Sequence, residues 1–444
     1  MKKHLIAVPL FLILLAAGIL FYLTRPDVAK LGEGQDVGRE PVLTAARTQL
    51  IPTASVAEAT GWQNGESPTA APGLSVTRFA DGLTHPRSML RLPNGDILVA
   101  ETNKAPPEGG GIKGMAMRHF MDKAGAGVAS PNRIMLLRDE DGDGKAEVKS
   151  TFIEGLNSPY GMALAGDTLY IANTDALLAF PYKDGDTRIT AEGKPLLSLP
   201  HAAPNMHWTR NLVASEDRKL LYIAIGSNSN VAENGLDTES NRAAVIEFNP
   251  RTGDNRIFAS GLRNPVGMAW NPVDGSLWTV VNERDELGSD MVPDYLTRVE
   301  FGGFYGWPWN YWGGYEDRRV QPGRPEVREY TRRPDYALGN HVAPLGLTFS
   351  KGADLGAPFK DGAFVGLHGS WNRVPKSGYK VVFVPFDKTG RAGPGKPVDV
   401  LTSFLGPEQE TARGRPVDVL VASDGALLVS DDVGGVIWRV SRKP

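Results

Sequence analysis

The sequence predicts an all-β fold, a six-bladed β-propeller behind an N-terminal helix. Three observations predict it. First, six segments share one plan, in which an apolar strand, a turn and a second apolar strand follow one another. Second, successive copies begin about 50 to 80 residues apart, which is typical of propeller blades that carry loop insertions. Third, long helical periodicity is absent after residue 70.

The fourth copy shows the plan most clearly. Two short apolar runs, 266–270 and 276–281, flank a turn that contains Asp-Gly, which is a β-hairpin signal. One such unit buries a single face, whereas blades packed around an axis bury every face and leave only short edges. An all-β sandwich is the alternative. The six copies are residues 87–100, 160–172, 210–225, 266–281, 345–367 and 417–430.

Composition agrees with one large, turn-rich β domain. The chain has 444 residues, enough to bury a large core, and it contains 51 glycines and 33 prolines. The net charge of −3 gives no sign of the basic surface that binds nucleic acid, so we expect no nucleic-acid partner. Cysteine is absent, which excludes disulfides and thiolate metal sites.

The chain begins with two lysines followed by an uncharged apolar run, residues 5–23. About 19 such residues are long enough to cross a bilayer. The positive flank predicts that the start stays cytoplasmic and the remainder is exported. A cleaved signal peptide is the alternative, although no clear A-x-A site follows.

We therefore expect three parts. Residues 1–23 form a signal anchor or transmembrane segment, and residues 24–70, which are polar and rich in Ala, Thr, Gly and Pro, form a flexible linker. Residues 71–444 form the propeller. The expected location is periplasmic, anchored to the inner membrane, or secreted if the segment is cleaved.

Two stretches interrupt the first blade. Residues 104–130 hold PPEGGG, GIKG and AGAG, and are expected to form a surface loop, or alternatively a lid or docking surface. Residues 139–144 (DEDGDG) resemble the first half of an EF-hand loop, which suits calcium. Position twelve of that loop is Ser150 rather than glutamate, and Asp-Gly is also ordinary hairpin chemistry, so a structural turn remains the alternative.

Several strings together resemble one family, the soluble glucose and sorbosone dehydrogenases that use pyrroloquinoline quinone (PQQ). The resemblance covers roughly residues 74–440, and GLRNP with a downstream YGWP is its most specific part. It implies a six-bladed propeller that binds PQQ and calcium. The strings are HWTRNLV with LYIAIGSNSN, GLRNPVGMAW, GGFYGWPW, HVAPLGLTF, HGSWNR and RGRPVDV.

His207 opens the first of these strings. A histidine titrates near neutrality and can take a proton from a substrate hydroxyl. The resemblance implies that role for His207 while hydride passes to the quinone. The family has an aspartate before this histidine, but here Met206 stands there, so any carboxylate that orients the ring must come from elsewhere.

Five residues match cofactor contacts of the family. Arginine offers a planar fork for the carboxylates of PQQ and stabilises charge on a reduced quinone. The resemblance implies that Arg263 and Asn264 contact the cofactor, that Arg413 and Arg415 approach its carboxylates, and that Arg373 replaces a family lysine. Because Arg413 and Arg415 alternate, both can point to one side of an extended segment.

The resemblance also implies a calcium site at backbone carbonyls that align with Arg284 and Asp285. The family has Gly-Pro at these positions, so this sequence departs from it, and a surface ion-pair cluster is the alternative. His341 and His368 flank the same face and are predicted to contact substrate. Trp307 lies in an aromatic stretch, residues 301–315, whose rings suit a sugar or a planar quinone.

These features together predict a PQQ-dependent dehydrogenase that oxidises an aldose, a sugar aldehyde such as sorbosone, or a related polyol. Electrons would leave to a quinone or cytochrome, and the membrane would be reached through the N-terminal segment. A non-enzymatic propeller that binds glycans or a protein is one alternative. A calcium-dependent lactonase is another, supported only by analogy of fold.

Overall fold

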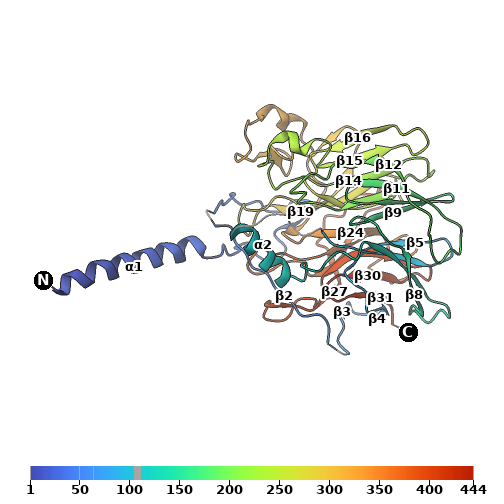
Figure 1. Ribbon diagram of the computed structural model, residues 1–444, viewed down its shortest axis with the longest axis horizontal. Helices are drawn as coiled ribbons and strands as arrows, with labels where there is room; N and C mark the ends of the chain where they lie inside the picture. The colour runs from blue at the N-terminus through green and yellow to red at the C-terminus, as the bar shows by residue number, and fades with distance from the viewer. Residues whose placement is uncertain (1, 50, 64, 105–111, 444) are drawn as a thin grey trace.

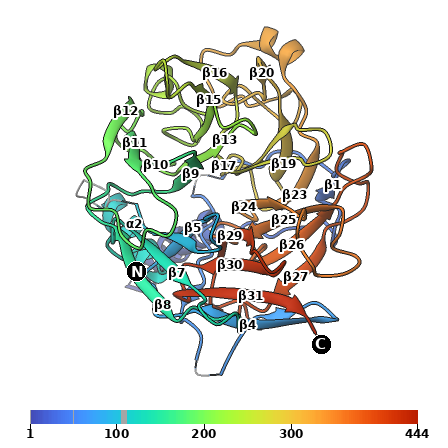
Figure 2. The ribbon, with the colours of Figure 1, turned by 90° about the vertical axis from the view of Figure 1, so that its right-hand side faces the viewer.

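Six antiparallel sheets radiate from a common axis, which confirms the predicted six-bladed propeller (Figure 2). The computed structural model describes residues 2–49, 51–63, 65–104 and 112–443. The two strands of every predicted repeat are the first two strands of a blade. The innermost strands of neighbouring blades contact one another around the ring.

The blades follow one another in chain order. Blade one contains β5 (Pro86–Arg91), β6 (Ile97–Glu101), β7 (Arg133–Arg138) and β8 (Val148–Ile153). Blade two contains β9 (Gly161–Ala165), β10 (Thr168–Ala172), β11 (Ala176–Pro181) and β12 (Lys194–Ser198). Blade three contains β13 (Arg210–Ala214), β14 (Leu221–Ile225), β15 (Ala244–Phe248), β16 (Asn255–Ser260) and the edge strand β20 (Gly303–Phe304).

The remaining blades borrow strands from the N-terminal part of the chain. Blade four contains β17 (Pro265–Trp270), β18 (Leu277–Val281), β19 (Pro293–Val299), β23 (Tyr336–Asn340) and β1 (Val37–Gly38). Blade five contains β24 (Pro344–Phe349), β25 (Gly362–Leu367), β26 (Lys380–Pro385), β27 (Val398–Thr402) and β3 (Thr69–Ala70). Blade six contains β29 (Pro416–Val421), β30 (Leu427–Asp431), β31 (Val436–Arg442) and β4 (Leu74–Ala80).

Blade six closes the ring, because the two ends of the propeller pair with each other. β31 and β4 are antiparallel, with Val440 opposite Val76 and Ile437 opposite Ala80. The pairing removes an open sheet edge at the point where the ring would otherwise split. It also explains why β4 begins at Leu74, where strand alternation starts in the sequence.

The core consists of apolar clusters between adjacent blades. Trp278 of blade four packs with Val365 of blade five, for example, and Phe364 of blade five packs with Trp438 of blade six. A smaller cluster joins the innermost strands near the axis through Tyr160, Val266, Leu345 and Val417. Each pair of facing blades therefore buries its own apolar cluster, and together these clusters make up the core of the ring.

The described residues between 24 and 70, a stretch expected to be a flexible linker, pack along the ring. Besides β1 and β3 they supply β2 (Glu58–Ala59), which pairs in parallel with β28 (Thr411–Ala412). Trp62 donates an indole hydrogen bond to Asp431 at 2.7 Å and packs edge-on against Trp438. These contacts use backbone groups and single side chains, so a composition poor in apolar residues does not reveal them.

Helices are few in the described part of the chain. α1 (Lys2–Thr24) covers the N-terminal apolar run and projects from the ring (Figure 1). Within the described residues, no helix combines the length and apolar character needed to cross a bilayer. Membrane attachment therefore stays a prediction.

Most of the stretch expected to be a surface loop, residues 104–130, is described. It contains the helix α2 (Ile112–Lys123), whereas residues 105–111 lie outside the described residues. The other short elements are β21 (Asn310–Tyr311), β22 (Tyr315–Glu316) and the 3-10 helices η1 (Leu236–Glu239) and η2 (Pro325–Tyr330).

Candidate active site

Most of the predicted site residues lie at one edge of the ring, which we call the mouth. The first strand of each blade starts at this edge and the antiparallel second strand returns to it. Residues that precede a first strand or follow a second strand therefore share the mouth. The first kind are His207, Arg263, Asn264, His341, Arg413 and Arg415, and the second kind are Arg284, Asp285, His368 and Arg373.

His207 precedes β13 and is oriented by Ser227, which follows β14. Its Nδ1 atom lies 3.0 Å from the Ser227 carbonyl oxygen and 2.9 Å from Ser227 Oγ. A carbonyl oxygen can only accept, so Nδ1 carries the proton. The Ser227 hydroxyl donates to the Ser229 carbonyl at 2.6 Å, which leaves Oγ as an acceptor. Nε2 is therefore the unprotonated nitrogen of the neutral ring.

Arg210 holds the backbone of His207 in place through a hydrogen bond. Arg210 is fully buried, and its Nη1 donates to the His207 carbonyl at 2.8 Å. Its Nη2 donates to the Pro200 carbonyl at 2.6 Å. The loop that carries His207 is thereby tied to the first strand of blade three.

The environment of His207 keeps it neutral. Burial lowers its pKa well below the ordinary value, and the cations Arg263, Lys104 and Arg242 lower it further. The hydrogen bond to Ser227 acts in the opposite direction. At neutral pH the ring is therefore unprotonated at Nε2 and can accept a proton.

Gly226 separates His207 from Asn264. A Cβ atom at position 226 would lie 2.4 Å from both Asn264 Oδ1 and His207 Cβ, so a side chain there would displace one of them. Asn264 Oδ1 is buried and has no hydrogen-bond partner among the described residues. An unpaired buried acceptor is costly. Its place beside His207 indicates where a donor of a ligand can bind.

Arg263 positions the loops of the mouth. It is 2% exposed, and all of its N–H groups face protein acceptors. Nε and Nη2 bond the carbonyl and side chain of Asn230, Nη1 bonds the carbonyls of Asn282 and Glu283, and Nη2 also bonds Asp285 at 2.9 Å. In the neighbouring Asn264, by contrast, the side-chain atom Oδ1 has no hydrogen-bond partner among the described residues.

The two carbonyls predicted to hold calcium differ. The Arg284 side chain is buried and pairs with Glu283 and Asp317, while its carbonyl has no donor within the part of the chain described. The Asp285 carbonyl accepts from Arg319 Nη1 at 3.0 Å. A guanidinium there competes with a cation, so the Arg284 carbonyl is the better ligand of the two.

His341 and Arg373 are structural neighbours of that loop. His341 Nε2 lies 2.9 Å from the Gly288 carbonyl, and its Nδ1 lies 3.9 Å from Asp285 Oδ1. Burial lowers the pKa of His341. Arg373 is buried and donates through Nε to the Ser289 carbonyl at 3.0 Å. Both side chains thus support the loop after β18.

Trp307 is 3% exposed, and its indole N–H donates to the Asn230 carbonyl at 2.9 Å. Its ring is packed inside the protein and is not offered to a sugar. The exposed indole of the mouth is Trp371, which is 40% exposed and precedes Arg373 by two residues.

A second polar cluster surrounds Asp432, which follows β30. Arg87 Nη1 lies 2.6 Å and His368 Nε2 lies 2.9 Å from Asp432 Oδ2, and His85 Nε2 lies 3.8 Å away. Although burial opposes it, the pKa of Asp432 is lowered by the hydrogen bond from His368 and by the charge of Arg87. Burial lowers the pKa of His368 to about 4. The cluster therefore contains an ionised carboxylate, a guanidinium and neutral imidazoles.

Arg413 and Arg415 have different partners, although their alternation predicts a shared side. Arg415 donates to the carbonyls of His368 and Gly369 at 3.1 and 2.8 Å and is buried. Arg413 Nε lies 3.8 Å from Glu66 Oε1, a partly exposed pair. Arg415 thus joins the Asp432 cluster, whereas Arg413 contacts the segment between α1 and the ring.

Several residues of the mouth were not predicted. They share one position in the repeat, because each lies in the loop after the second strand of a blade or at the start of a first strand. They are Arg87, Lys104, Gly226, Ser227, Asn230 and Asp432.

The acidic turn after β7 lies at the opposite edge of the ring. Oxygen atoms of Asp139, Asp141, Asp143 and Glu147 lie within 4.8 Å of one another. Asp139 accepts backbone N–H bonds from Gly142 and Gly144, as a tight turn requires. Calcium binding at this turn stays a prediction.

Comparison with known proteins adds a family and a fold. The model of the TrAA12-like family matches residues 68–294 and 326–443. A pyrroloquinoline quinone-dependent pyranose dehydrogenase of Coprinopsis cinerea is 25% identical over 431 residues, covering 84% of this chain and 54% of that protein. The chain thus spans about half the length of that relative. Aldose sugar dehydrogenase YliI of Escherichia coli (strain K12) is 26% identical over 403 residues, covering 84% and 94%.

Among solved structures, the calcium structure of a Trichoderma reesei carbohydrate-active enzyme of family AA12 superposes with a TM-score of 0.68. The match covers 87% of this chain and 100% of that one at 20% identity. At this identity the likeness supports the propeller fold.

Proposed function

Because the chain belongs to the TrAA12-like family, and relatives of it are PQQ-dependent sugar dehydrogenases, we propose that it oxidises a sugar with PQQ as the electron acceptor. The finer proposal is an aldose, a sorbosone-like sugar aldehyde or a related polyol as substrate. One observation carries the proposal. A neutral histidine base, with Nδ1 anchored and Nε2 free, stands beside an unpaired buried acceptor, Asn264 Oδ1.

The residues of the mouth fit the cofactor. PQQ carries three carboxylates and an ortho-quinone, which call for donors and positive charge. Arg242 Nη2 and Arg87 Nε are buried and have no hydrogen-bond partner within the described residues. Lys104 is a third cation near His207, and burial lowers its pKa. Arg263 contributes by fixing the surrounding loops.

The chemistry needs a proton acceptor at the substrate hydroxyl. When bound, PQQ supplies the acceptor for the hydride from the carbon that carries this hydroxyl. His207 Nε2 takes the hydroxyl proton, so the substrate loses one hydride and one proton and becomes a carbonyl compound. The Nδ1–H bond to Ser227 holds the ring in place through the transfer, because that proton never leaves Nδ1.

Three further groups complete the proposed site. Calcium is the proposed metal, with the Arg284 carbonyl as a ligand and Asp285 beside it. Trp371 is the exposed ring on which a sugar can stack. His368, oriented by Asp432, is a polar contact for the same substrate.

The location and electron acceptor are also part of the proposal. The protein is exported, held at the membrane through its N-terminal segment, and passes electrons to a quinone or a cytochrome. The apolar, exposed surface of α1 supports membrane attachment.

The proposal is tested with purified protein, PQQ and calcium, by following an artificial dye with a panel of sugars. Sugar-dependent dye reduction that requires PQQ supports it. No reduction with any sugar, under conditions in which the absorbance spectrum reports bound PQQ, would refute it.

A further inference from the structure

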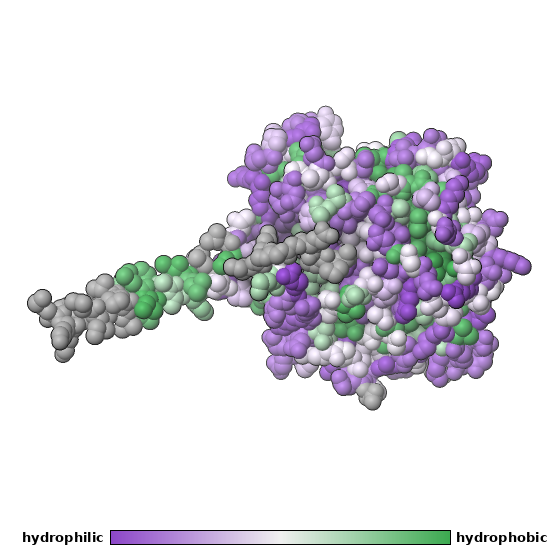
Figure 3. Space-filling view, viewed as in Figure 1, coloured by the Kyte–Doolittle hydropathy of each residue, from purple (hydrophilic) through white to green (hydrophobic). Residues whose placement is uncertain are grey.

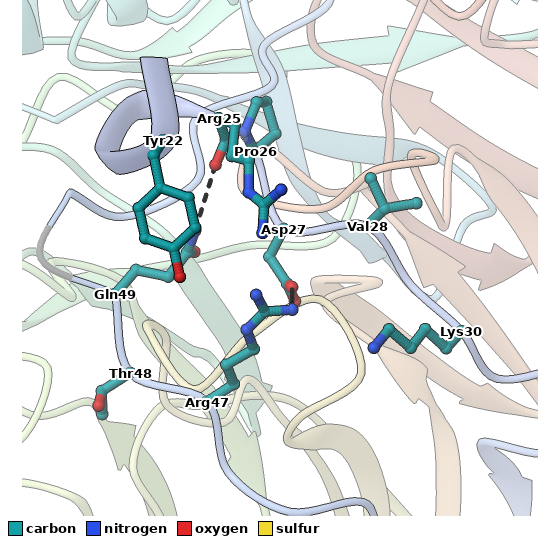
Figure 4. Close-up of a pocket in the computed structure, with 9 residues that line it drawn as sticks. All are labelled: Tyr22, Arg25, Pro26, Asp27, Val28, Lys30, Arg47, Thr48 and Gln49. Atoms are coloured by element: carbon teal, nitrogen blue, oxygen red, sulfur yellow. Dashed lines mark hydrogen bonds and ion pairs between the residues drawn. The ribbon is translucent and has the colours of Figure 1, made fainter. Parts of the chain in front are cut away.

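A cavity of about 620 Å³ lies where α1 joins the ring (Figure 4). Tyr22, Arg25, Asp27, Lys30 and Arg47 are among its lining residues. Arg25 stacks over the Tyr22 ring at 4.8 Å. Arg47 and Lys30 point toward Asp27 from opposite sides, as Figure 4 shows. The function proposed above does not use this cavity.

The cavity carries excess positive charge. Arg25, Lys30 and Arg47 face one carboxylate, Asp27, so three positive charges minus one negative charge leave two. Asp27 is already engaged, because Arg47 Nη1 lies 2.5 Å from its Oδ1. The side chains of Arg25 and Lys30 are exposed, and the Asp290 carboxylate, which does not line the cavity, accepts the backbone N–H of Lys30 at 2.6 Å. A phosphate group matches such a set of donors.

The cavity adjoins a large apolar surface. Every described side chain of α1 from residue 11 to residue 22 is exposed, including Phe11 at 64% and Phe21 at 72%. Figure 3 shows this helix projecting into solvent away from the ring. An apolar helix that ends in tyrosine and cations is the pattern of a segment whose end lies at a lipid interface.

The cavity is also tied to the mouth. The Asp27 carboxylate accepts the backbone N–H of Ser289 at 2.8 Å, and the Asp27 carbonyl accepts the Ser289 hydroxyl at 2.6 Å. Ser289 lies in the mouth loop after β18, and its carbonyl accepts from Arg373. α1 ends at Thr24, only three residues earlier, and three extended residues span about 10 Å. A surface that holds α1 therefore lies beside the mouth.

We infer that this cavity binds the phosphate of an anionic phospholipid and thereby turns the mouth toward the lipid surface. The inference adds an orientation at the membrane to the proposed dehydrogenase. It rests on that proposal for the function assigned to the mouth. It predicts that an electron acceptor dissolved in the lipid reaches the site more readily at the mouth than from the opposite edge of the ring.

Vesicle binding by the full chain tests the headgroup site. Phosphatidylcholine vesicles are compared with vesicles that also contain phosphatidylglycerol, and the full chain should prefer the latter. Arg25→Gln and Lys30→Gln should each weaken that binding about fivefold, and together about 25-fold, because each cation near an anionic surface adds a similar attraction. Lys351→Gln with Lys388→Gln, two exposed lysines at the opposite edge, should leave binding unchanged.

Three results would overturn the headgroup site. One is equal binding to both vesicle types, which would assign attachment to the apolar helix alone. Another is full competition by inorganic phosphate, which would assign the cavity to the free anion. The third is a dimer held through α1 that no longer binds vesicles, as sedimentation velocity would detect.

Fluorescence measures the orientation, because the chain contains no cysteine to interfere with labelling. A dye on Leu236→Cys reports the mouth, since η1 lies in the loop between β14 and β15. A dye on Lys388→Cys reports the opposite edge. Energy transfer to a labelled headgroup should be strong from the first and weak from the second. Equal or reversed transfer would contradict the orientation.

The two proposals fail separately. In detergent with a soluble dye, the Arg25→Gln, Lys30→Gln variant should oxidise sugars as the unmodified chain does, because neither residue lies in the mouth. Lipid binding without any sugar oxidation would refute only the dehydrogenase. Sugar oxidation without a preference for anionic lipid would refute only the headgroup site.

Discussion

The Nδ1 atom of His207 lies 3.0 Å from the carbonyl oxygen of Ser227. This contact sets the tautomer without a carboxylate, because the carbonyl can only accept. A serine at this position also leaves the ring without the neighbouring negative charge that would raise its pKa. The proposed base is therefore neutral and weakly basic.

Replacing the base should separate turnover from binding. His207→Ala should lower sugar oxidation about 100- to 10,000-fold, the usual contribution of a general base, while the affinity for PQQ stays close to normal. His201→Ala is the matched control, because His201 lies in the same loop and its ring contacts the Leu199 carbonyl at 2.9 Å. Turnover and PQQ titration measure the two effects. Full turnover by His207→Ala would exclude the assigned role.

The acidic limb of the pH profile reports the pKa of the base. Because that pKa is lowered, the active neutral form persists below the ordinary imidazole range, and kcat/KM should fall only at lower pH. Ser227→Asp supplies a carboxylate and should move this limb upward by about 1 to 3 pH units. Ser227→Ala keeps the backbone carbonyl and should leave the limb near its original place. An unmoved limb in Ser227→Asp would argue against Ser227 as the orienting residue.

Gly226 is predicted to be intolerant of any side chain. In Gly226→Ala the new Cβ atom would meet Asn264 Oδ1 and His207 Cβ at 2.4 Å, so one of them must move. We expect a loss of turnover together with about 1 to 3 kcal/mol of unfolding free energy. Gly395→Ala, where nothing lies within 4 Å, is the control. Normal turnover in Gly226→Ala would show that the His207–Asn264 spacing does not matter.

The Asp432 cluster should be a large contributor to stability. Asp432→Asn leaves Arg87 buried without its counter-charge, and should lower the free energy of unfolding by about 3 to 5 kcal/mol. Asp354→Asn breaks an exposed pair with Arg442 and should cost at most about 1 kcal/mol. Denaturant unfolding at neutral pH measures both. Equal costs would contradict the assigned role of burial.

The same cluster predicts a direction for the pH dependence of stability. His368 has a pKa of about 4 in the folded state, below its ordinary value, so the unfolded chain binds this proton more readily. The contribution of His368 to the free energy of unfolding is therefore present at neutral pH and is lost as the pH falls toward about 4. A rise in unfolding free energy over that range in the unmodified chain, but not in His368→Gln, would contradict this.

The sequence was sufficient to predict the ring and the edge at which the site lies. Each repeat places polar residues before its first strand or after its second strand, so the sequence alone assigns His207, Asn264 and Asp285 to one edge of the ring. The same rule would have found Ser227 and Asp432.

Other features depend on contacts that the sequence does not display. The sequence shows that position 263 is an arginine, but not that all of its N–H groups face protein acceptors. It shows that Trp307 is aromatic, but not that the ring is buried while Trp371 is exposed. Residues 24–70 read as a tether, because their contacts with the ring are mainly backbone pairs and single side chains such as Trp62.

The most direct test is sugar oxidation by the full chain loaded with PQQ and calcium, compared with the same protein lacking PQQ and with His207→Ala. We predict sugar-dependent dye reduction by the loaded protein alone, with PQQ bound equally by the variant. Equal dye reduction by the loaded protein and the variant, or none by either while PQQ is bound, would contradict the proposed mechanism.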